Sequence, residues 1–311
     1  MSDRHYSIRH ATIYDYEGEV VHAHQLFHLV PRACERQTVR RHVVEVTPAP
    51  ASRSEEVDAF GNPVTRLEFD RPHKRLEVVA ELEVEVRNGT VTTLEGGDPW
   101  EAVRDGLAYH PAALPTERLD ANRFRLRSPY VRLKTAFADY AEECFPRGAS
   151  ILAGTQALMT KIHREFEYAP GETTVATPLV EVLEKRRGVC QDFTHLMIAC
   201  LRSLGLAARY VSGYLRTTRK EAASLLTGSD ASHAWASVYC PPLGWIDLDP
   251  TNGLPIGGGH VTIAWGRDFG DVSPLRGVIF GGGRHTVAVE VSTREVAAPA
   301  SSPIENPPLA R

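Results

Sequence analysis

The sequence contains little cysteine. Five cysteines are scattered over 311 residues, with no Cys-x-x-Cys pair among them: Cys34, Cys144, Cys190, Cys200 and Cys240. A structural zinc site or a disulfide framework needs paired, regularly spaced cysteines, so both are excluded. An odd number of scattered thiols is typical of a reducing compartment, and we expect a cytoplasmic protein.

Long apolar runs and an excess of positive charge are also missing. No stretch approaches the roughly 20 apolar residues that a membrane helix needs, and the polar start Met-Ser-Asp-Arg-His does not lead into the apolar segment of a secretory signal. Lys and Arg total 35 against 39 Asp and Glu, which gives a net charge of −4 and a pI near 6.4. Such a balance does not attract phosphate backbones or anionic membranes. We therefore expect neither nucleic acid nor a membrane as a partner.

Cofactor motifs are absent as well. Neither a phosphate loop nor a dinucleotide fingerprint occurs, because the glycine triplets do not open helices. His24 and His28 have the H-x-x-x-H spacing of helical zinc sites. They lie in an expected strand, however, where four residues at ~3.3 Å each hold the pair too far apart for one ion. We expect no metal and no cofactor.

The first ninety residues carry a strand pattern. Between Leu76 and Val86, apolar residues occupy every second position and mostly glutamates lie between them, which predicts one dry and one wet face. Shorter alternating runs cover Tyr6–Tyr14, Gln25–Pro31 and Val39–Val46. Turn-forming segments such as residues 58–63 separate them. The pattern predicts an antiparallel β-sandwich over residues 1–95, with a scaffold or docking role.

A different pattern follows this domain. Residues 96–127 read as a linker or meander, and residues 128–293 as an α+β core with clear helical periodicity from Ala149 to Tyr168. Residues 294–311 are rich in Pro, Ala and Ser and are predicted to be a disordered tail. Two domains also suit the length, since single cores seldom exceed ~250–300 residues. Strands are expected at Ala208–Leu215, His233–Tyr239, Trp245–Asp249 and His285–Val291.

Cys190 begins the most regular helix. Its apolar stripe ends before Gly205 and consists of Phe193, Leu196, Met197, Cys200, Leu201 and Leu204. Cys190 lies one turn ahead of Phe193 on the same stripe, where unpaired N–H groups and the positive dipole end favour a thiolate. Its own backbone N–H could also donate to an oxyanion. The alternative is a small buried apolar residue, as free cysteines often are.

A histidine and two aspartates follow on a predicted hairpin. His233 begins one strand, and the next strand carries Asp247 and Asp249, with Pro-Pro and Gly244 between the two. An aspartate on the neighbouring strand could orient the imidazole, which is the general arrangement of cysteine acyl transfer. Because Asp247 and Asp249 are two residues apart, they share a face, and periodicity does not choose between them.

These segments resemble the bacterial transglutaminase-like superfamily. The nucleophile motif is similar to residues 187–196, Arg-Gly-Val-Cys-Gln-Asp-Phe-Thr-His-Leu, and the histidine motif to His233-Ala234-Trp235. The aspartate motif is similar to residues 244–252, and residues 58–62 with the strand at Leu76 resemble the N-terminal β-sandwich of these proteins. The resemblance implies a papain-like α+β core with Cys190 as nucleophile, His233 as base and acid, and Asp249 as the orienting acid.

Other residues near these motifs are weaker candidates. Tyr168 could be a second oxyanion donor, and Gln191 and Trp235 are candidates for contact with the oxyanion or the substrate. Asp192 and His195, three residues apart on the nucleophile helix, could line the cleft, although a structural role is the simpler interpretation.

Transfer to an amine and transfer to water share the same acyl-enzyme. The resemblance implies that the cross-linking enzymes of animals use a tryptophan upstream of the nucleophile as an oxyanion donor, whereas here no tryptophan lies between Trp100 and Cys190. We therefore predict a cysteine-type amidohydrolase or peptidase acting on a peptide, protein or small amide. A protein-glutamine transglutaminase and a non-enzymatic binding protein of the same fold are the alternatives.

Overall fold

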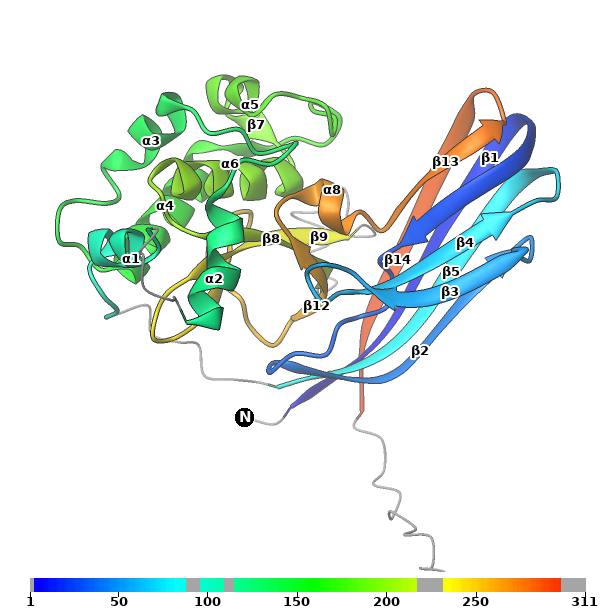
Figure 1. Ribbon diagram of the computed structural model, residues 1–311, viewed down its shortest axis with the longest axis horizontal. Helices are drawn as coiled ribbons and strands as arrows, with labels where there is room; N and C mark the ends of the chain where they lie inside the picture. The colour runs from blue at the N-terminus through cyan, green and yellow to red at the C-terminus, as the bar shows by residue number, and fades with distance from the viewer. Residues whose placement is uncertain (1–2, 88–95, 109–114, 217–231, 298–311) are drawn as a thin grey trace, which may run out of the picture.

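The computed structural model describes residues 3–87, 96–108, 115–216 and 232–297. Figure 1 shows two parts side by side, a long antiparallel sheet and a mixed core of helices and a shorter sheet. This is the predicted α+β class. Among the described residues, no helix combines the length and apolar character needed to cross a membrane.

The first five strands build the N-terminal sheet in the order β2-β5-β1-β4-β3. Their bounds are β1 Arg4–Phe27, β2 Gln37–Thr47, β3 Ser52–Val57, β4 Pro63–Phe69 and β5 His73–Val86. In β5 every second residue from Leu76 to Val86 is buried, so the predicted dry face is confirmed. The glutamates between them lie on the opposite face.

Two C-terminal strands complete the same sheet, which corrects the predicted core boundary at residue 293. β13 (Leu275–Gly281) pairs with residues 20–27 of β1, and β14 (His285–Val296) pairs with residues 5–16. The chain passes from β13 to β14 at Gly281–Gly283, where the Gly18 N–H donates to the Gly282 carbonyl at 2.9 Å. A Cβ on Gly281 would lie 2.3 Å from the Glu19 carbonyl oxygen, so this close approach requires glycine.

The predicted tail is also partly wrong, because β14 runs on to Val296; residues 298–311 lie outside the described part of the chain. Local alternation predicts that His285–Val291 is a strand. It carries no information about a partner strand more than 260 residues earlier in the chain, and this is why the boundary was misplaced.

The described parts of the segment predicted as a linker, residues 96–108 and 115–127, contain short helices; residues 109–114 lie outside the description. Its elements are α1 Trp100–Gly106, α2 Thr116–Asn122 and the short 3-10 helix η1 Arg123–Arg125. Val103, Ala121 and Phe124 are buried by them. These helices are too short for periodicity to show, and their stability comes from packing on the core.

The core combines four helices with a five-stranded sheet. The helices are α3 Thr135–Glu142, α4 Ile151–Glu165, α5 Leu179–Lys185 and α6 Cys190–Ser203. The sheet has the order β11-β10-β9-β8-β12, with β8 Ala208–Leu215, β9 His233–Tyr239, β10 Trp245–Asp249, β11 Leu254–Pro255 and β12 His260–Gly266. Short β6 Glu167–Tyr168 pairs with β7 Arg187–Gly188, and α8 Phe269–Val272 follows β12. The apolar stripe of α6 is buried from Phe193 to Leu201 and packs against this sheet, and Leu204 just beyond the helix is partly buried.

Side-chain amides of the N-terminal domain bind the core strand β12. Gln37 donates to the Thr262 carbonyl at 2.5 Å and accepts from the Thr262 N–H at 2.9 Å. Asn62 makes the same pair of bonds with Trp265, at 2.8 and 3.0 Å. Since β12 is an edge strand of the core sheet, the two amides satisfy backbone groups that would otherwise lack partners. The two domains are therefore joined through β12.

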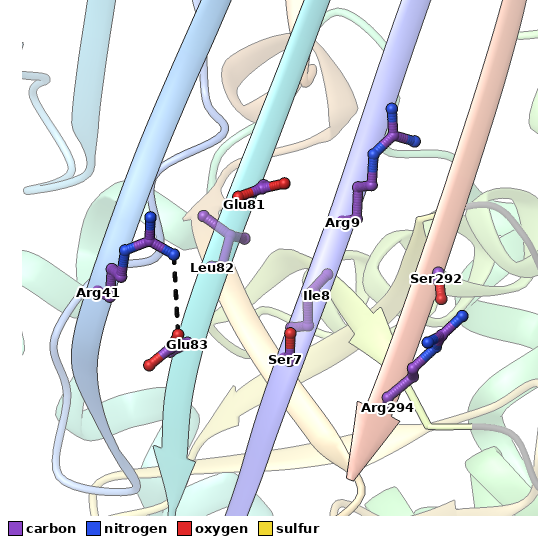
Figure 2. Close-up of a pocket in the computed structure, with 9 residues that line it drawn as sticks. All are labelled: Ser7, Ile8, Arg9, Arg41, Glu81, Leu82, Glu83, Ser292 and Arg294. Carbon is purple, nitrogen blue, oxygen red and sulfur yellow. Dashed lines mark ion pairs between the residues drawn. The ribbon is translucent and has the colours of Figure 1, made fainter. Parts of the chain in front are cut away.

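The outer face of the N-terminal sheet is charged. A hollow of about 420 Å³ lies across β2, β5, β1 and β14. Figure 2 shows the arginines and glutamates that these strands place along it. The Arg41 guanidinium lies 3.8 Å from the Glu83 carboxylate, and about half of each side chain is exposed. Charges of this kind keep a sheet face wet and contribute little stability.

Candidate active site

Cys190 is the first residue of α6, and the turn before it is shaped by Asp192. The Asp192 carboxylate accepts hydrogen bonds from the Val189 N–H at 2.9 Å and from the Thr173 hydroxyl at 2.6 Å. This is the capping arrangement in which an acid at the third helical position satisfies the backbone ahead of the helix. A Cβ on Gly188 would lie 2.7 Å from that carboxylate, so the turn also needs glycine. Cys190 is thereby fixed at the positive end of the helix dipole.

His233 connects Cys190 to Asp249. The imidazole Nε2 lies 2.7 Å from Asp249 Oδ2, and the side chain also hydrogen bonds to the Cys190 thiol. Because Nε2 is engaged by Asp249, Nδ1 is the nitrogen that remains for the sulfur. Burial works to lower the pKa of His233, but the charge and hydrogen bond of Asp249, together with Cys190, outweigh it and raise the pKa to about 10. The imidazole is therefore held as a cation at neutral pH.

Asp249, at the end of β10, is completely buried and accepts five hydrogen bonds. The donors are His233, His260 and Asn252 side chains and the backbone N–H groups of Thr251 and Asn252. Burial alone would raise the pKa of this carboxyl, but the charge and hydrogen bond of His233 and the bond from His260 hold it well below its usual range. Asp249 is thus a fixed carboxylate.

The structure shows which of the two aspartates contacts His233, a choice that the strand periodicity leaves open. Asp247 lies opposite Ser237 in the sheet and 3.7 Å from the Arg36 guanidinium, away from His233. Asp249 lies where β10 ends, and the following turn folds Thr251 and Asn252 back onto its carboxylate. The difference arises from that turn, which a period-two pattern does not describe.

His260 is a site residue that sequence reasoning missed. It begins β12, and its Nε2 lies 3.2 Å from Asp249 Oδ2. Its ring meets the buried Trp235 edge-on at 5.3 Å, and burial lowers its pKa. Nδ1 of His260 is buried with no partner among the described residues. The available signal was the large apolar residue at every second position, Val261, Ile263 and Trp265, after the first glycine triplet, which predicts one more strand.

The weaker candidates fall into two groups. Tyr168 lies on β6 opposite Gly188, and burial together with the nearby Cys190 raises its pKa to about 12. Trp235 is buried two residues from His233, with its ring 6.2 Å from the imidazole and its indole N–H unpartnered within the described chain. Both border the site. Gln191 is partly buried beside Cys190 at the start of α6.

Asp192 and His195 have structural surroundings. Asp192 caps the helix, as described above. The His195 imidazole Nε2 accepts from the Phe269 N–H at 3.1 Å, and its ring stacks on Tyr130. Complete burial lowers the pKa of His195 to about 3, so it is neutral. Neither side chain contacts His233.

His233, Asp249 and His260 are also the residues of this site that could hold a metal, since their ligand atoms lie within 4.8 Å of one another. Both histidine Nε2 atoms, however, point at the same carboxylate oxygen and are engaged in hydrogen bonds with it. The arrangement suits a charge-assisted hydrogen-bond network beside a thiol better than a metal.

Comparison with known proteins identifies the family of this chain. Residues 6–85 match the bacterial transglutaminase-like N-terminal region, and residues 138–250 match the transglutaminase-like superfamily. The uncharacterized protein Rv2569c of Mycobacterium tuberculosis is 37% identical over 278 residues, which cover 87% of this chain and 86% of that protein. A protein-glutamine gamma-glutamyltransferase of Pseudomonas aeruginosa is 30% identical over 107 residues, or 32% of this chain and 16% of that enzyme.

The same fold occurs in a solved structure. The crystal structure of a proposed cysteine protease from Cytophaga hutchinsonii superposes with a TM-score of 0.71 at 20% identity, and the match covers 97% of this chain and 93% of that one. At this identity the likeness concerns the fold, and it includes both domains. The chain belongs to the bacterial transglutaminase-like superfamily.

Proposed function

We propose that this protein is a cysteine-nucleophile enzyme that hydrolyses amide bonds in a protein or peptide through a thioester. The observation that carries the proposal is the connected set Cys190, His233 and Asp249, supplied by α6, β9 and β10 and joined by hydrogen bonds. A nucleophile, a base and a group that orients the base are the parts that such a reaction needs.

In the first half of the reaction, the Cys190 sulfur attacks the amide carbon and His233 protonates the departing amine. The cationic imidazole is suited to this step because Asp249 holds it protonated. Negative charge develops on the substrate oxygen. The Cys190 backbone N–H, in the first helical turn where no intrahelical acceptor exists, is one donor for it. The Tyr168 hydroxyl, kept protonated by burial, is the second.

In the second half, His233 accepts a proton from water as the water attacks the thioester, and Cys190 leaves as the thiolate. Asp249 stays ionised throughout, because its five donors leave no vacancy for a proton. Its task is to keep Nε2 of His233 protonated and Nδ1 directed at the sulfur.

We favour water as the acceptor of the acyl group because the tryptophan upstream of Cys190 is engaged elsewhere. Trp100, which precedes Cys190 by 90 residues, donates its indole N–H to the Pro146 carbonyl at 3.2 Å and packs on Phe145. It is therefore occupied elsewhere and does not provide the indole donor expected of a cross-linking enzyme. Transfer to an amine is the second candidate, and it is favoured by the partial similarity to the Pseudomonas gamma-glutamyltransferase.

Mass spectrometry of casein or a glutamine peptide separates these two candidates. The protein is incubated with the substrate, with and without a primary amine, next to a Cys190→Ala control. Hydrolysis or deamidation that exceeds amine incorporation supports the hydrolase. Amine incorporation that outruns hydrolysis assigns a transglutaminase instead.

Thiol labelling tests the enzyme against a non-catalytic protein of the same fold, and it needs no substrate. With iodoacetamide near neutral pH, Cys190 should react much faster than the other four cysteines. Buried Cys144, Cys200 and Cys240 are intrinsic controls, because burial raises the pKa of each thiol. The preference should disappear in His233→Ala; equal reactivity of all five thiols indicates a scaffold.

The state of the cysteines also supports our proposal of a reducing, cytoplasmic location. All five are free thiols, and three of them, Cys144, Cys200 and Cys240, are buried. A secreted protein of this size commonly uses some of its cysteines in disulfides. Fractionation of the producing cells tests this proposal directly.

A further inference from the structure

A second group of two histidines and a carboxylate lies on the N-terminal sheet, in the other domain. His22 and His24 are two residues apart on β1, so both point to the outer face of the sheet. Glu68 of β4 lies directly opposite His24 in the antiparallel register. The ligand atoms of the three side chains all lie within 4.8 Å of one another.

The two imidazoles point their Nε2 atoms at each other across 2.9 Å, with ring planes 75° apart. His22 Nε2 is also 3.7 Å from Glu68 Oε1. A neutral pair of imidazoles satisfies such a contact only if one Nε2 carries a proton and the other a lone pair. A cation between them would use both lone pairs. In tetrahedral coordination with metal–nitrogen bonds of about 2.0–2.1 Å, the two nitrogens would be roughly 3.3 Å apart, a small opening from the distance observed.

A hydrogen bond orients the Glu68 carboxylate as a third ligand beside the two histidines. Glu68 Oε2 accepts a hydrogen bond from the Ser52 hydroxyl on β3 at 3.3 Å, which leaves Oε1 toward the histidines. The neighbouring Arg66 is engaged by Glu56 at 2.9 Å and does not neutralise Glu68. Outer hydrogen bonds of this kind orient the ligands of metal sites.

Apolar side chains border the other side of the group. Phe280 of β13 pairs with His22 in register, with its ring 6.0 Å from the imidazole, and Val278 pairs with His24. They offer no competing ligand, whereas exposed His24 leaves room for water in a fourth position.

We propose that His22, His24 and Glu68 form a binding site for a divalent transition-metal ion, with Zn²⁺ as the best match. Two imidazole nitrogens, one carboxylate oxygen and an open position for water make up a ligand set that zinc takes. Calcium and magnesium prefer sites made of oxygens, and they do not fit. The ion would bridge β1 and β4, and so fasten two strands of the sheet far from the thiol chemistry of the core.

Calorimetric titration with ZnCl₂ tests the site on the full chain in a Cys190→Ser background, which removes the nucleophilic thiol as a competing ligand. We expect one equivalent to bind. His22→Gln or His24→Gln should weaken binding by about tenfold or more, and Glu68→Gln by less, because each removes a ligand. His42→Gln is the matched control, since His42 is an exposed histidine of β2 in the same sheet.

A second readout follows from the bridge between strands. Excess ZnCl₂ should raise the melting temperature of the parent protein and leave that of the His22→Gln/His24→Gln double variant unchanged. Circular dichroism verifies that the double variant is folded. Two outcomes would overturn the proposal. One is that the double variant binds zinc as tightly as the His42→Gln control does. The other is that binding is lost only when His233 or His260 is replaced. The thiol-labelling rate of Cys190 is independent of this site, so the two proposals fail separately.

Discussion

The molecule gathers two histidines and one carboxylate in two regions, and burial makes the two groups differ. In the core, His233, Asp249 and His260 are enclosed, and both imidazoles are hydrogen bonded to one carboxylate oxygen. On the N-terminal sheet, His22, His24 and Glu68 are partly or largely exposed, and the imidazoles face each other instead. The same residue types therefore form a proton-handling network in one place and a ligand set in the other.

The difference shows that burial determines how many hydrogen-bond partners a carboxylate needs. A buried carboxylate must be fully paired, because an unpaired charge away from water is costly. Asp249 meets this need with five donors and in return fixes the protonation of His233. Glu68 keeps water and needs only a weak hydrogen bond from Ser52. Substitutions in the two regions, and at the contact between the domains, test whether burial causes this difference.

The largest effect is expected from Asp249→Asn. The amide cannot stabilise the His233 imidazolium, and it favours the wrong tautomer. If the proposed function is correct, turnover of amide substrates should fall by about 10³–10⁴, as removal of the orienting carboxylate does in known catalytic triads. Steady-state kinetics measure the loss, and selective alkylation of Cys190 by iodoacetamide should decline with it.

Asp247→Asn is the matched control, with the same chemical change two residues earlier on β10. Asp247 faces Arg36 and not His233, so turnover should stay within a few-fold of the wild type. Equal losses in the two variants would contradict the assignment of Asp249.

The second largest effect concerns the connection between the regions, and it is expected from Asn62→Ala. The Asn62 side chain is buried and makes four hydrogen bonds, two of them with the Trp265 backbone in the strand that carries His260. At about 1 kcal/mol for each bond, the free energy of unfolding should fall by about 3–4 kcal/mol in urea denaturation. Ser54→Ala, on exposed β3, is the control; an equally small change in both variants would mean that the domains are stable independently.

The sequence predicts the parts of this arrangement that depend on local pattern. The three strands Ala208–Leu215, His233–Tyr239 and Trp245–Asp249 have the predicted bounds, and Cys190 begins the helix that its apolar stripe indicates. Local periodicity does not indicate which distant strand a segment pairs with. This is why the predicted core of residues 128–293 includes segments that pair with β1 in the N-terminal sheet.

The same limit applies within the site. His260 contacts Asp249 from an edge strand whose position is set by Gln37 and Asn62 of the other domain. The exposed group was missed for another reason. The pair considered for a metal was His24 and His28, at helical spacing, whereas in a strand the residues that share a face are two apart, which pairs His24 with His22.

A smaller effect is expected from His260→Gln, which keeps a donor but removes the imidazole. Loss or misplacement of one hydrogen bond to a buried carboxylate costs about 1–3 kcal/mol, so turnover should fall by roughly 10–100-fold with little change in KM. His260→Phe, which lacks any donor, should lose more. If both variants lose activity equally, the ring packs against Trp235 and does not position Asp249.

The pH dependence of stability tests whether burial holds His260 neutral in the folded protein. Burial lowers the pKa of His260 below its ordinary 6.5, so the unfolded chain binds this proton more tightly than the folded protein does. Stability from a neutral His260 is thus lost as the pH falls through about 6.5. The free energy of unfolding of the wild type, minus that of His260→Gln, should rise as the pH increases through about 6.5 and then stay level.

The smallest effect is expected on the outer face of the sheet, where Arg41 and Glu83 lie opposite each other (Figure 2). Their charges are 3.8 Å apart and about half exposed, so water and salt screen the attraction. Arg41→Ala should change the free energy of unfolding by less than about 0.5 kcal/mol, as measured by urea denaturation at low and high salt. A loss comparable to that of Asn62→Ala would mean that charges on this exposed face are coupled as strongly as those around Asp249, and burial would then not be what separates the two regions.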